Sequence, residues 1–280
     1  MGGLRSAARN HPLTLFYVLT LVLSWLPAPL TGGSLLPHGP FLAAVLVLTL
    51  TEGRRGLAEL FGRMAKWRVS WYWYLIAPGL VIGYLLVAFA LNLLLGARIA
   101  ETAHLRSAGV VAGLALELLI FGGQWEEPGW TGYALPWLQG RYAGRPYGLL
   151  MASLHLGALR ALWHLPLVIY GHIPWFDLVF LSMALQFLVT WLFNRTRGSV
   201  LIVMLAHLTS NVVGGGLMVP LFAGADYTRF YILFIAVAWL VALLLVRRGV
   251  GACAGAWKGS PKRSKWRFDE RCADGYNPIC

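Results

Sequence analysis

Long apolar runs joined by short polar connections make up most of the chain. A run of about 20 apolar residues is long enough to cross roughly 30 Å of hydrocarbon as an α-helix. Such runs lie at residues 13–30, 35–51, 71–95, 110–136, 147–170, 176–193, 198–220 and 229–247. The pattern predicts an all-α, polytopic transmembrane helical bundle with about eight spans.

Composition and charge narrow this prediction. Hydrophobic residues make up 58% of the 280 residues and charged residues only 12%, whereas a soluble domain has roughly 45–50% apolar and about 25% charged residues. This composition excludes a soluble globular enzyme. With the N-terminus inside, 19 of the 23 Lys and Arg residues fall on the cytoplasmic side, and three fall outside. We therefore expect both termini to be cytoplasmic, and we assign the formal charge of +12 to cytoplasmic loops and the tail.

Two segments outside the spans have a composition of their own. Residues 52–70 carry apolar side chains at helical spacing with basic residues between them, which predicts an interfacial amphipathic helix. Residues 251–280 mix Gly, Lys, Arg and Ser with little apolar periodicity. We therefore expect a transmembrane domain over residues 1–250, followed by a basic, disordered tail over residues 251–280.

Polar side chains inside the spans are the candidates for function. A charged side chain at the centre of a bilayer costs about 2.5–3.5 kcal/mol on insertion scales, so ionisable residues are rare there unless they serve a purpose. Three spans carry polar groups at membrane depth: Gln124, Glu126 and Glu127 in the fourth, His155, Arg160 and His164 in the fifth, and His207 and Asn211 in the seventh.

The positions of these side chains suit hydrolysis. Adjacent residues on a helix diverge by about 100°, so Glu126 can face a cavity while Glu127 holds a supporting partner. A carboxylate and a neutral imidazole, such as that of His164, are the usual groups of general acid–base catalysis. His207 and Asn211 lie one helical turn apart on one face, so both can donate hydrogen bonds toward one developing oxyanion.

The three motifs, taken in this order and spacing, resemble the CPBP family of CAAX proteases and bacteriocin-processing enzymes, also called the Abi family. The family pattern is Glu-Glu-x-x-x-Arg, then Phe-x-x-x-His, then His-x-x-x-Asn or His-x-x-x-Asp. This chain has Glu126-Glu127-Pro128-Gly129-Trp130-Thr131, Arg160-Ala161-Leu162-Trp163-His164 and His207-Leu208-Thr209-Ser210-Asn211. It departs from the pattern at Thr131, in the arginine position, and at Arg160, in the phenylalanine position.

The resemblance implies an intramembrane endopeptidase with its protease core at about residues 110–220. Its catalytic residues would be Glu126, Glu127, His164, His207 and Asn211. The first glutamate and His164 would activate a water, His207 and Asn211 would stabilise the oxyanion, and the second glutamate would support the geometry. We further expect Arg160 to supply, from the fifth span, the positive charge that Thr131 lacks.

Three alternatives stay open at this point. A metalloprotease would use Glu126, His164 and His207 as zinc ligands with water in the fourth position, whereas we predict an enzyme without metal or other cofactor. A scaffold or immunity protein would keep the same fold with little or no proteolysis, which the Thr131 departure would fit. A proton-coupled transporter would use the same carboxylate and histidines as a relay.

The resemblance also implies the partners. We expect a peptide or protein substrate that enters from the membrane or the cytoplasmic side. Eukaryotic relatives cleave prenylated CaaX tails, while a bacterial chain could instead act on a peptide, a bacteriocin leader or a membrane-protein segment. The lipid bilayer is the other expected partner, nucleic acid is not, and the expected location is a bacterial cell membrane.

Overall fold

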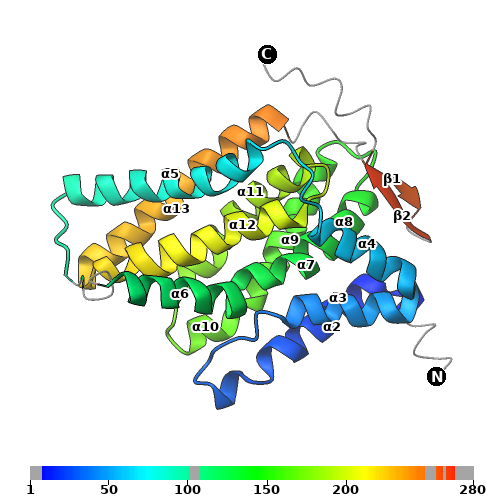
Figure 1. Ribbon diagram of the computed structural model, residues 1–280, viewed down its shortest axis with the longest axis horizontal. Helices are drawn as coiled ribbons and strands as arrows, with labels where there is room; N and C mark the ends of the chain where they lie inside the picture. Colours follow the sequence, from blue (N-terminus) through cyan, green and yellow to red (C-terminus); the bar gives the residue numbers. More distant parts are fainter. Residues whose placement is uncertain (1–7, 101, 103–106, 250–256, 261–262, 269–280) are drawn as a thin grey trace.

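The computed structural model describes residues 8–100, 102, 107–249, 257–260 and 263–268. Its body is a bundle of helices that run back and forth along the longest axis of the molecule (Figure 1). The predicted all-α, polytopic helical bundle is confirmed for this body. The described chain ends lie toward the same end of the bundle, shown on the right in Figure 1.

Helices occupy every predicted span. The unbroken ones are α3 (Gly39–Thr51), α5 (Trp73–Leu94) and α13 (Gly224–Gly249), while α2 (Pro12–Trp25) continues into the short η1 (Ala28–Leu30). Among the described residues, six helical stretches are long and apolar enough to cross a membrane, and two apolar helices, one of them α3, are shorter. Eight crossings with cytoplasmic termini stays a prediction.

The fourth span is broken in its middle. It consists of α6 (Ala108–Phe121), η3 (Gly123–Glu126), α7 (Glu127–Gly129), the π-helical η4 (Trp130–Ala134) and α8 (Leu135–Arg141). Gly122 separates α6 from η3 with an extended backbone, at φ −78° and ψ 168°. The Gln124 side-chain amide donates to the carbonyls of Leu118 and Leu119 at 2.6 and 2.8 Å, so it caps the end of α6.

The other polar spans are interrupted too. The fifth consists of α9 (Gly148–Trp163) and α10 (Leu165–Ile169), the sixth of the π-helical η5 (Asp177–Leu181) and α11 (Ser182–Arg195), and the seventh of α12 (Val200–Thr209), the π-helical η6 (Ser210–Met218) and η7 (Val219–Leu221). π-helical turns occur frequently at functional sites, because the extra residue re-aims the side chains of the turn.

Large apolar side chains fill the centre of the bundle around these breaks. Phe16, Trp130, Trp163, Phe193 and Phe230 are fully buried. Phe16 packs edge-on against Trp130 with 5.5 Å between ring centroids, so α2 supports the broken fourth span from behind.

The predicted interfacial helix is shorter than the sequence pattern suggested. It is α4 (Arg54–Met64), and the chain after it runs without helix to the start of α5. Leu60 is buried while Phe61 is exposed, so α4 packs one apolar row inward and presents another outward. Lys66 and Ser199 tie this segment to the start of α12, since the Ser199 hydroxyl donates to the Lys66 carbonyl at 2.8 Å.

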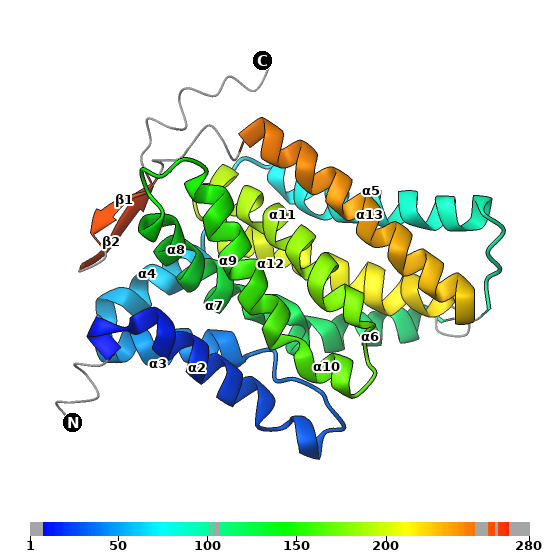
Figure 2. The ribbon, with the colours of Figure 1, turned by 180° about the vertical axis from the view of Figure 1, so that it is seen from behind.

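Part of the predicted tail is described as two short strands. β1 (Trp257–Ser260) pairs antiparallel with β2 (Arg263–Phe268), with Trp257 opposite Phe268, and β1 lies beside α8 (Figures 1 and 2). The other residues of the segment 251–280, for which we predicted disorder, lie outside the described residues.

Candidate active site

Most of the predicted site residues line a single cavity between the broken helices. Glu126 from η3, Arg160 from α9, His164 just after α9, His207 from α12 and Asn211 from η6 all border a space of about 560 Å³. Segments far apart in the sequence thus bring their polar groups together at one place. Glu127 does not border the cavity, because it lies fully buried beside it.

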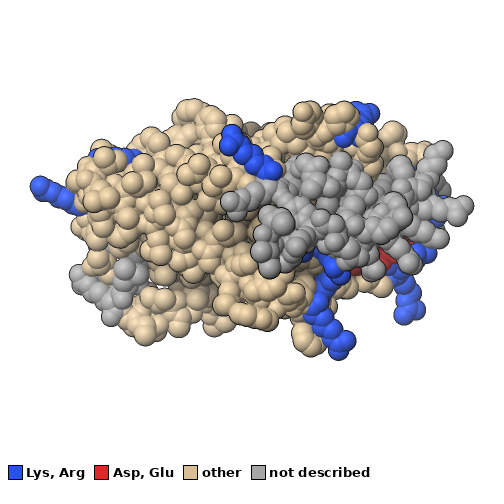
Figure 3. Space-filling view, turned by 90° about the horizontal axis from the view of Figure 1, so that it is seen from above, with Lys and Arg blue, Asp and Glu red and all other residues tan. Residues whose placement is uncertain are grey.

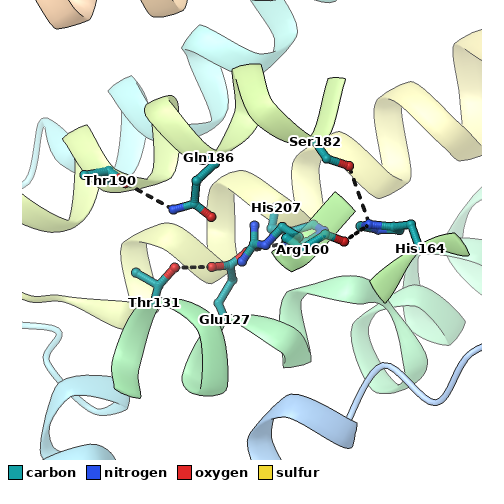
Figure 4. A network of polar contacts seen from close by, with 8 residues as sticks. All are labelled: Glu127, Thr131, Arg160, His164, Ser182, Gln186, Thr190 and His207. Carbon is teal, nitrogen blue, oxygen red and sulfur yellow. Dashed lines mark hydrogen bonds and ion pairs between the residues drawn. The ribbon is translucent and has the colours of Figure 1, made fainter. Parts of the chain in front are cut away.

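Glu127 is the hub of a buried polar network (Figure 4). Its Oε1 accepts a hydrogen bond from His207 Nδ1 at 2.7 Å and lies 2.9 Å from Arg160 Nη2. Its Oε2 accepts a hydrogen bond from the Thr131 hydroxyl. A buried carboxylate is costly unless it is paired. Arg160 is the cation that pairs with Glu127, as expected from the sequence.

The contact with Glu127 fixes which edge of His207 faces the cavity. Because Nδ1 points to the carboxylate, Nε2 points toward Gly123. A Cβ atom built on Gly123 would lie 2.7 Å from His207 Nε2, 2.7 Å from Glu126 Oε1 and 3.1 Å from Asn211 Nδ2. Three polar atoms from three segments therefore surround one point next to a residue that has no side chain.

His164 is held by its own helix. Its Nδ1 lies 2.8 Å from the Arg160 carbonyl oxygen and 3.5 Å from the Ser182 hydroxyl (Figure 4). A carbonyl oxygen can only accept, so Nδ1 carries the proton and the lone pair of the neutral ring is at Nε2. Trp163 packs edge-on against the ring at 4.8 Å and limits its rotation.

Sequence reasoning missed three residues that shape this site. Gly123 keeps the convergence point open, and Ser182 contacts His164. Arg63 of α4 donates from Nη1 to the Gly132 carbonyl in η4 at 2.7 Å. Burial lowers the pKa of Arg63, and nearby carboxylates on and before α4 oppose that shift. The Gly-Gly pair before the two glutamates was a sequence signal for Gly123, but no sequence signal pointed to Ser182 or Arg63.

His155, the remaining polar residue of the fifth span, lies elsewhere. Its Nδ1 is 3.1 Å from the Tyr142 hydroxyl, and it does not border the cavity. Within the described part of the chain, no three His, Cys, Asp or Glu side chains gather closely enough to hold a metal ion. The candidate zinc set of Glu126, His164 and His207 is therefore not assembled as a ligand group in this structure.

Comparison with known proteins matches the segment that carries the site. Residues 107–213 match the family model described as type II CAAX prenyl endopeptidase Rce1-like. A CAAX prenyl protease 2 from Methanococcus maripaludis is 32% identical over 108 residues, which cover 35% of this chain and 38% of that relative. The match thus spans well under half of the relative's length. Glu126, Glu127, His164, His207 and Asn211 all lie within residues 107–213.

Proposed function

We propose that this chain, an integral membrane protein that belongs to the CPBP family of CAAX-protease-like proteins, is an endopeptidase that hydrolyses peptide bonds inside the membrane. The observation that carries the proposal is the convergence of Glu126 Oε1, His207 Nε2 and Asn211 Nδ2 beside Gly123, at the wall of a cavity that His164 also borders. These groups are a base, a second acceptor and two donors, which is what addition of water to a carbonyl needs.

Glu126 is the proposed general base. Its Oε2 has no hydrogen-bond partner among the described residues, so at least one oxygen of this carboxylate is available to a water. Glu126 takes one proton from a water while the free lone pair of His164 Nε2 orients that water by accepting a hydrogen bond. The remaining hydroxide adds to the scissile carbonyl carbon, and the carbonyl oxygen becomes an oxyanion.

His207 and Asn211 are the proposed oxyanion donors. The Asn211 amide donates in any state. His207 places Nδ1–H on the Glu127 carboxylate, so it donates from Nε2 only as an imidazolium. Glu127 stabilises that cation, since it lies 2.7 Å away and is fully buried. When the tetrahedral intermediate collapses, the carbon–nitrogen bond breaks, and Glu126 returns its proton to the leaving amine.

Glu127 is the proposed positioning residue, together with Arg160. It contacts no cavity space, but it fixes the ring orientation of His207 and carries the charge that makes an imidazolium favourable. Arg160 Nη2, at 2.9 Å, balances Glu127 when His207 is neutral. This pairing keeps the buried carboxylate ionised through the whole reaction.

Replacement of the base tests the proposal. Glu126→Gln keeps the shape of the side chain and should lower kcat for cleavage of a quenched fluorescent peptide library by about 10²–10⁴-fold, the usual contribution of a general base. Glu117→Gln is the matched control, because Glu117 is an exposed carboxylate on α6 of the same span, and it should leave kcat unchanged. Cleavage that survives Glu126→Gln would overturn the assignment, and absence of cleavage by the unmodified chain would favour the scaffold or transporter alternatives.

A further inference from the structure

The loop between α11 and α12 has an arginine where its backbone favours glycine. The Arg197 amide donates to the Asn194 carbonyl at 3.1 Å, and the Gly198 amide donates to the Phe193 carbonyl at 2.7 Å. These are the two bonds of a Schellman motif, whose left-handed residue is usually glycine. Here that residue is Arg197, at φ 54°. A left-handed backbone is strained for a residue with a side chain, so we look for a function of the Arg197 side chain.

A second segment brings another cation to this loop. Lys66, just after α4, donates from Nζ to the Arg197 carbonyl oxygen at 2.7 Å. Arg195, the last residue of α11, has its guanidinium carbon 5.9 Å from the centre of the Trp191 ring, and the Arg197 side chain is exposed. The sequence has no Asp or Glu at residues 60–100 or at residues 178–225. Three cations therefore lie on two touching segments that contain no acidic residue.

Exposed aromatic side chains accompany these cations. Trp67 and Trp71 are 62% and 73% exposed, and Trp191 packs edge-on against Trp73 with 5.4 Å between ring centroids. Trp side chains concentrate where a membrane meets water, at the level of the lipid headgroups. Figure 3 shows more of the Lys and Arg side chains on this half of the molecule, which carries α4 in Figure 1, than on the other half. The basic aromatic surface consists of Lys66, Trp67, Trp71, Arg195 and Arg197.

This surface is bonded to the helix that carries His207. The Ser199 hydroxyl donates to the Lys66 carbonyl at 2.8 Å. The same oxygen accepts a hydrogen bond from the Ile202 amide at 3.4 Å, so Ser199 also caps the N-terminus of α12. A change in the position of the Lys66 segment therefore acts directly on the start of α12.

A second connection leads from the same segment to Glu127. Arg63, shortly before Lys66 in the chain, donates to the Gly132 carbonyl at 2.7 Å. Gly132 follows Thr131, whose hydroxyl donates to Glu127 Oε2. The segment that carries part of the basic aromatic surface thus contacts both η4 and α12, which contain the Thr131 and His207 partners of Glu127.

We propose that the basic aromatic surface binds the headgroup phosphate of an anionic phospholipid, and that the bound lipid raises the rate of cleavage by holding the starts of α12 and η4 in place. Each Lys or Arg near an anionic membrane surface strengthens binding about fivefold. A zwitterionic headgroup carries its own cation beside the phosphate and gains less from three basic residues. The lipid site stands on charge and geometry alone, whereas its effect on cleavage rests on the proposed function.

Lipid binding is measured on the full chain in detergent, independently of any activity. Native mass spectrometry should show that the chain retains dioleoylphosphatidylglycerol in preference to dioleoylphosphatidylcholine. Arg197→Gly should weaken binding of the anionic lipid about fivefold. The same variant should keep or raise the unfolding midpoint, because glycine adopts φ 54° without strain. Arg197→Lys keeps the charge and should bind the anionic lipid nearly as well as the unmodified chain.

Tyr147→Gly is the matched control for the strain. Tyr147 is exposed and also has a left-handed backbone, at φ 59°, before the start of α9. Its replacement relieves the same strain without removal of a charge, so the affinity for anionic lipid should not change. Equal retention of the two lipids, or full affinity of Arg197→Gly, overturns the inference. Displacement of the lipid by an equal concentration of inorganic phosphate also overturns it, because the surface would then be a site for soluble phosphate.

Nanodiscs test the effect of the lipid on cleavage. With phosphatidylglycerol mixed into phosphatidylcholine, kcat of the unmodified chain should rise about 2- to 30-fold over phosphatidylcholine alone, the range for coupling through a contiguous network. KM should change little, and Arg197→Gly should have the same kcat in both bilayers. A kcat that does not respond to phosphatidylglycerol overturns the regulation by lipid. Absence of cleavage in both bilayers, with the lipid preference retained, would instead refute the proposed function while the lipid site stands.

Discussion

The sharpest test of the site is to move the positive charge that contacts Glu127 from position 160 on α9 to position 131 on η4. In the family pattern the cation follows the glutamate pair by four residues, and here Thr131 holds that position. Arg160, on α9, contacts Glu127 instead. If Arg160 is the functional replacement, Arg160→Ala should damage the enzyme far more than Thr131→Ala, although both side chains contact the same carboxylate.

The magnitude follows from burial and charge. The Glu127 side chain is 0% exposed and that of Arg160 is 4% exposed, and removal of one partner from a buried ion pair costs about 3–5 kcal/mol. Loss of the Thr131 hydroxyl removes one hydrogen bond to a charged group, which is worth about 1.5–3 kcal/mol. The two variants should differ by about 1.5–2 kcal/mol, or roughly 10- to 30-fold in an equilibrium constant.

The assay compares kcat/KM for peptide cleavage with the unfolding midpoint of each variant in detergent. A double variant carries both Arg160→Phe and Thr131→Arg, which restores the family pattern and returns a cation to the neighbourhood of Glu127. It should recover activity relative to Arg160→Phe alone, so the double-mutant cycle should show coupling. Equal losses for Arg160→Ala and Thr131→Ala, or purely additive effects in the cycle, would refute the reasoning.

Three further predictions concern other parts of the site. Gly123→Ala should abolish cleavage with little change in unfolding midpoint, because the new Cβ would lie 2.7 Å from both Glu126 Oε1 and His207 Nε2. Gly113→Ala is the control and should retain activity, because the space around Gly113 is open. Arg63→Met should lower kcat more than it changes KM, and it should destabilise the fold by about 1.5–3 kcal/mol, because the variant loses the hydrogen bond to the Gly132 carbonyl. Arg68→Met, at an exposed position, is the control. A change in KM alone would contradict a role of Arg63 in supporting the site. Cleavage should persist in a chelator at full rate, and activity that follows one bound zinc per chain would support the metalloprotease alternative instead.

Hydrophobic patterning predicted the helices well because the bilayer restricts the choices of the chain. The predicted span 71–95 is α5, Trp73–Leu94, and the predicted span 198–220 is the stretch Val200–Leu221. The least regular span, 35–51, begins as a helix only at Gly39, where Pro40 occupies the first turn. Polar residues at membrane depth are rare, so the same pattern also pointed to the residues that the structure brings to one cavity.

The pairing within the site could not be read from spacing. Whether Glu126 or Glu127 faces the cavity depends on how η3 and α7 are rotated after the break at Gly122. The contact between Glu127 and His207 joins residues 80 positions apart. The π-helical turns shift side-chain directions relative to a regular helix, and no local sequence signal identifies them. Arg160 could be recognised as unusual at membrane depth, but its contact with Glu127 Oε1 could not be named from the sequence. Arg63 gave no signal at all, and its bond to the Gly132 carbonyl appears only in the structure.

The break in the fourth span explains how a free carboxylate persists inside a membrane protein. A helix end in a bilayer exposes carbonyl groups that must find donors within the protein. Gln124 supplies both hydrogens of its amide to the last turn of α6, and the Trp125 indole donates to the Leu119 carbonyl at 3.0 Å. Because these neighbours satisfy the backbone, Glu126 does not have to. The residues around the break thus stabilise the helix end, and Glu126 keeps its oxygens available for a water in the cavity.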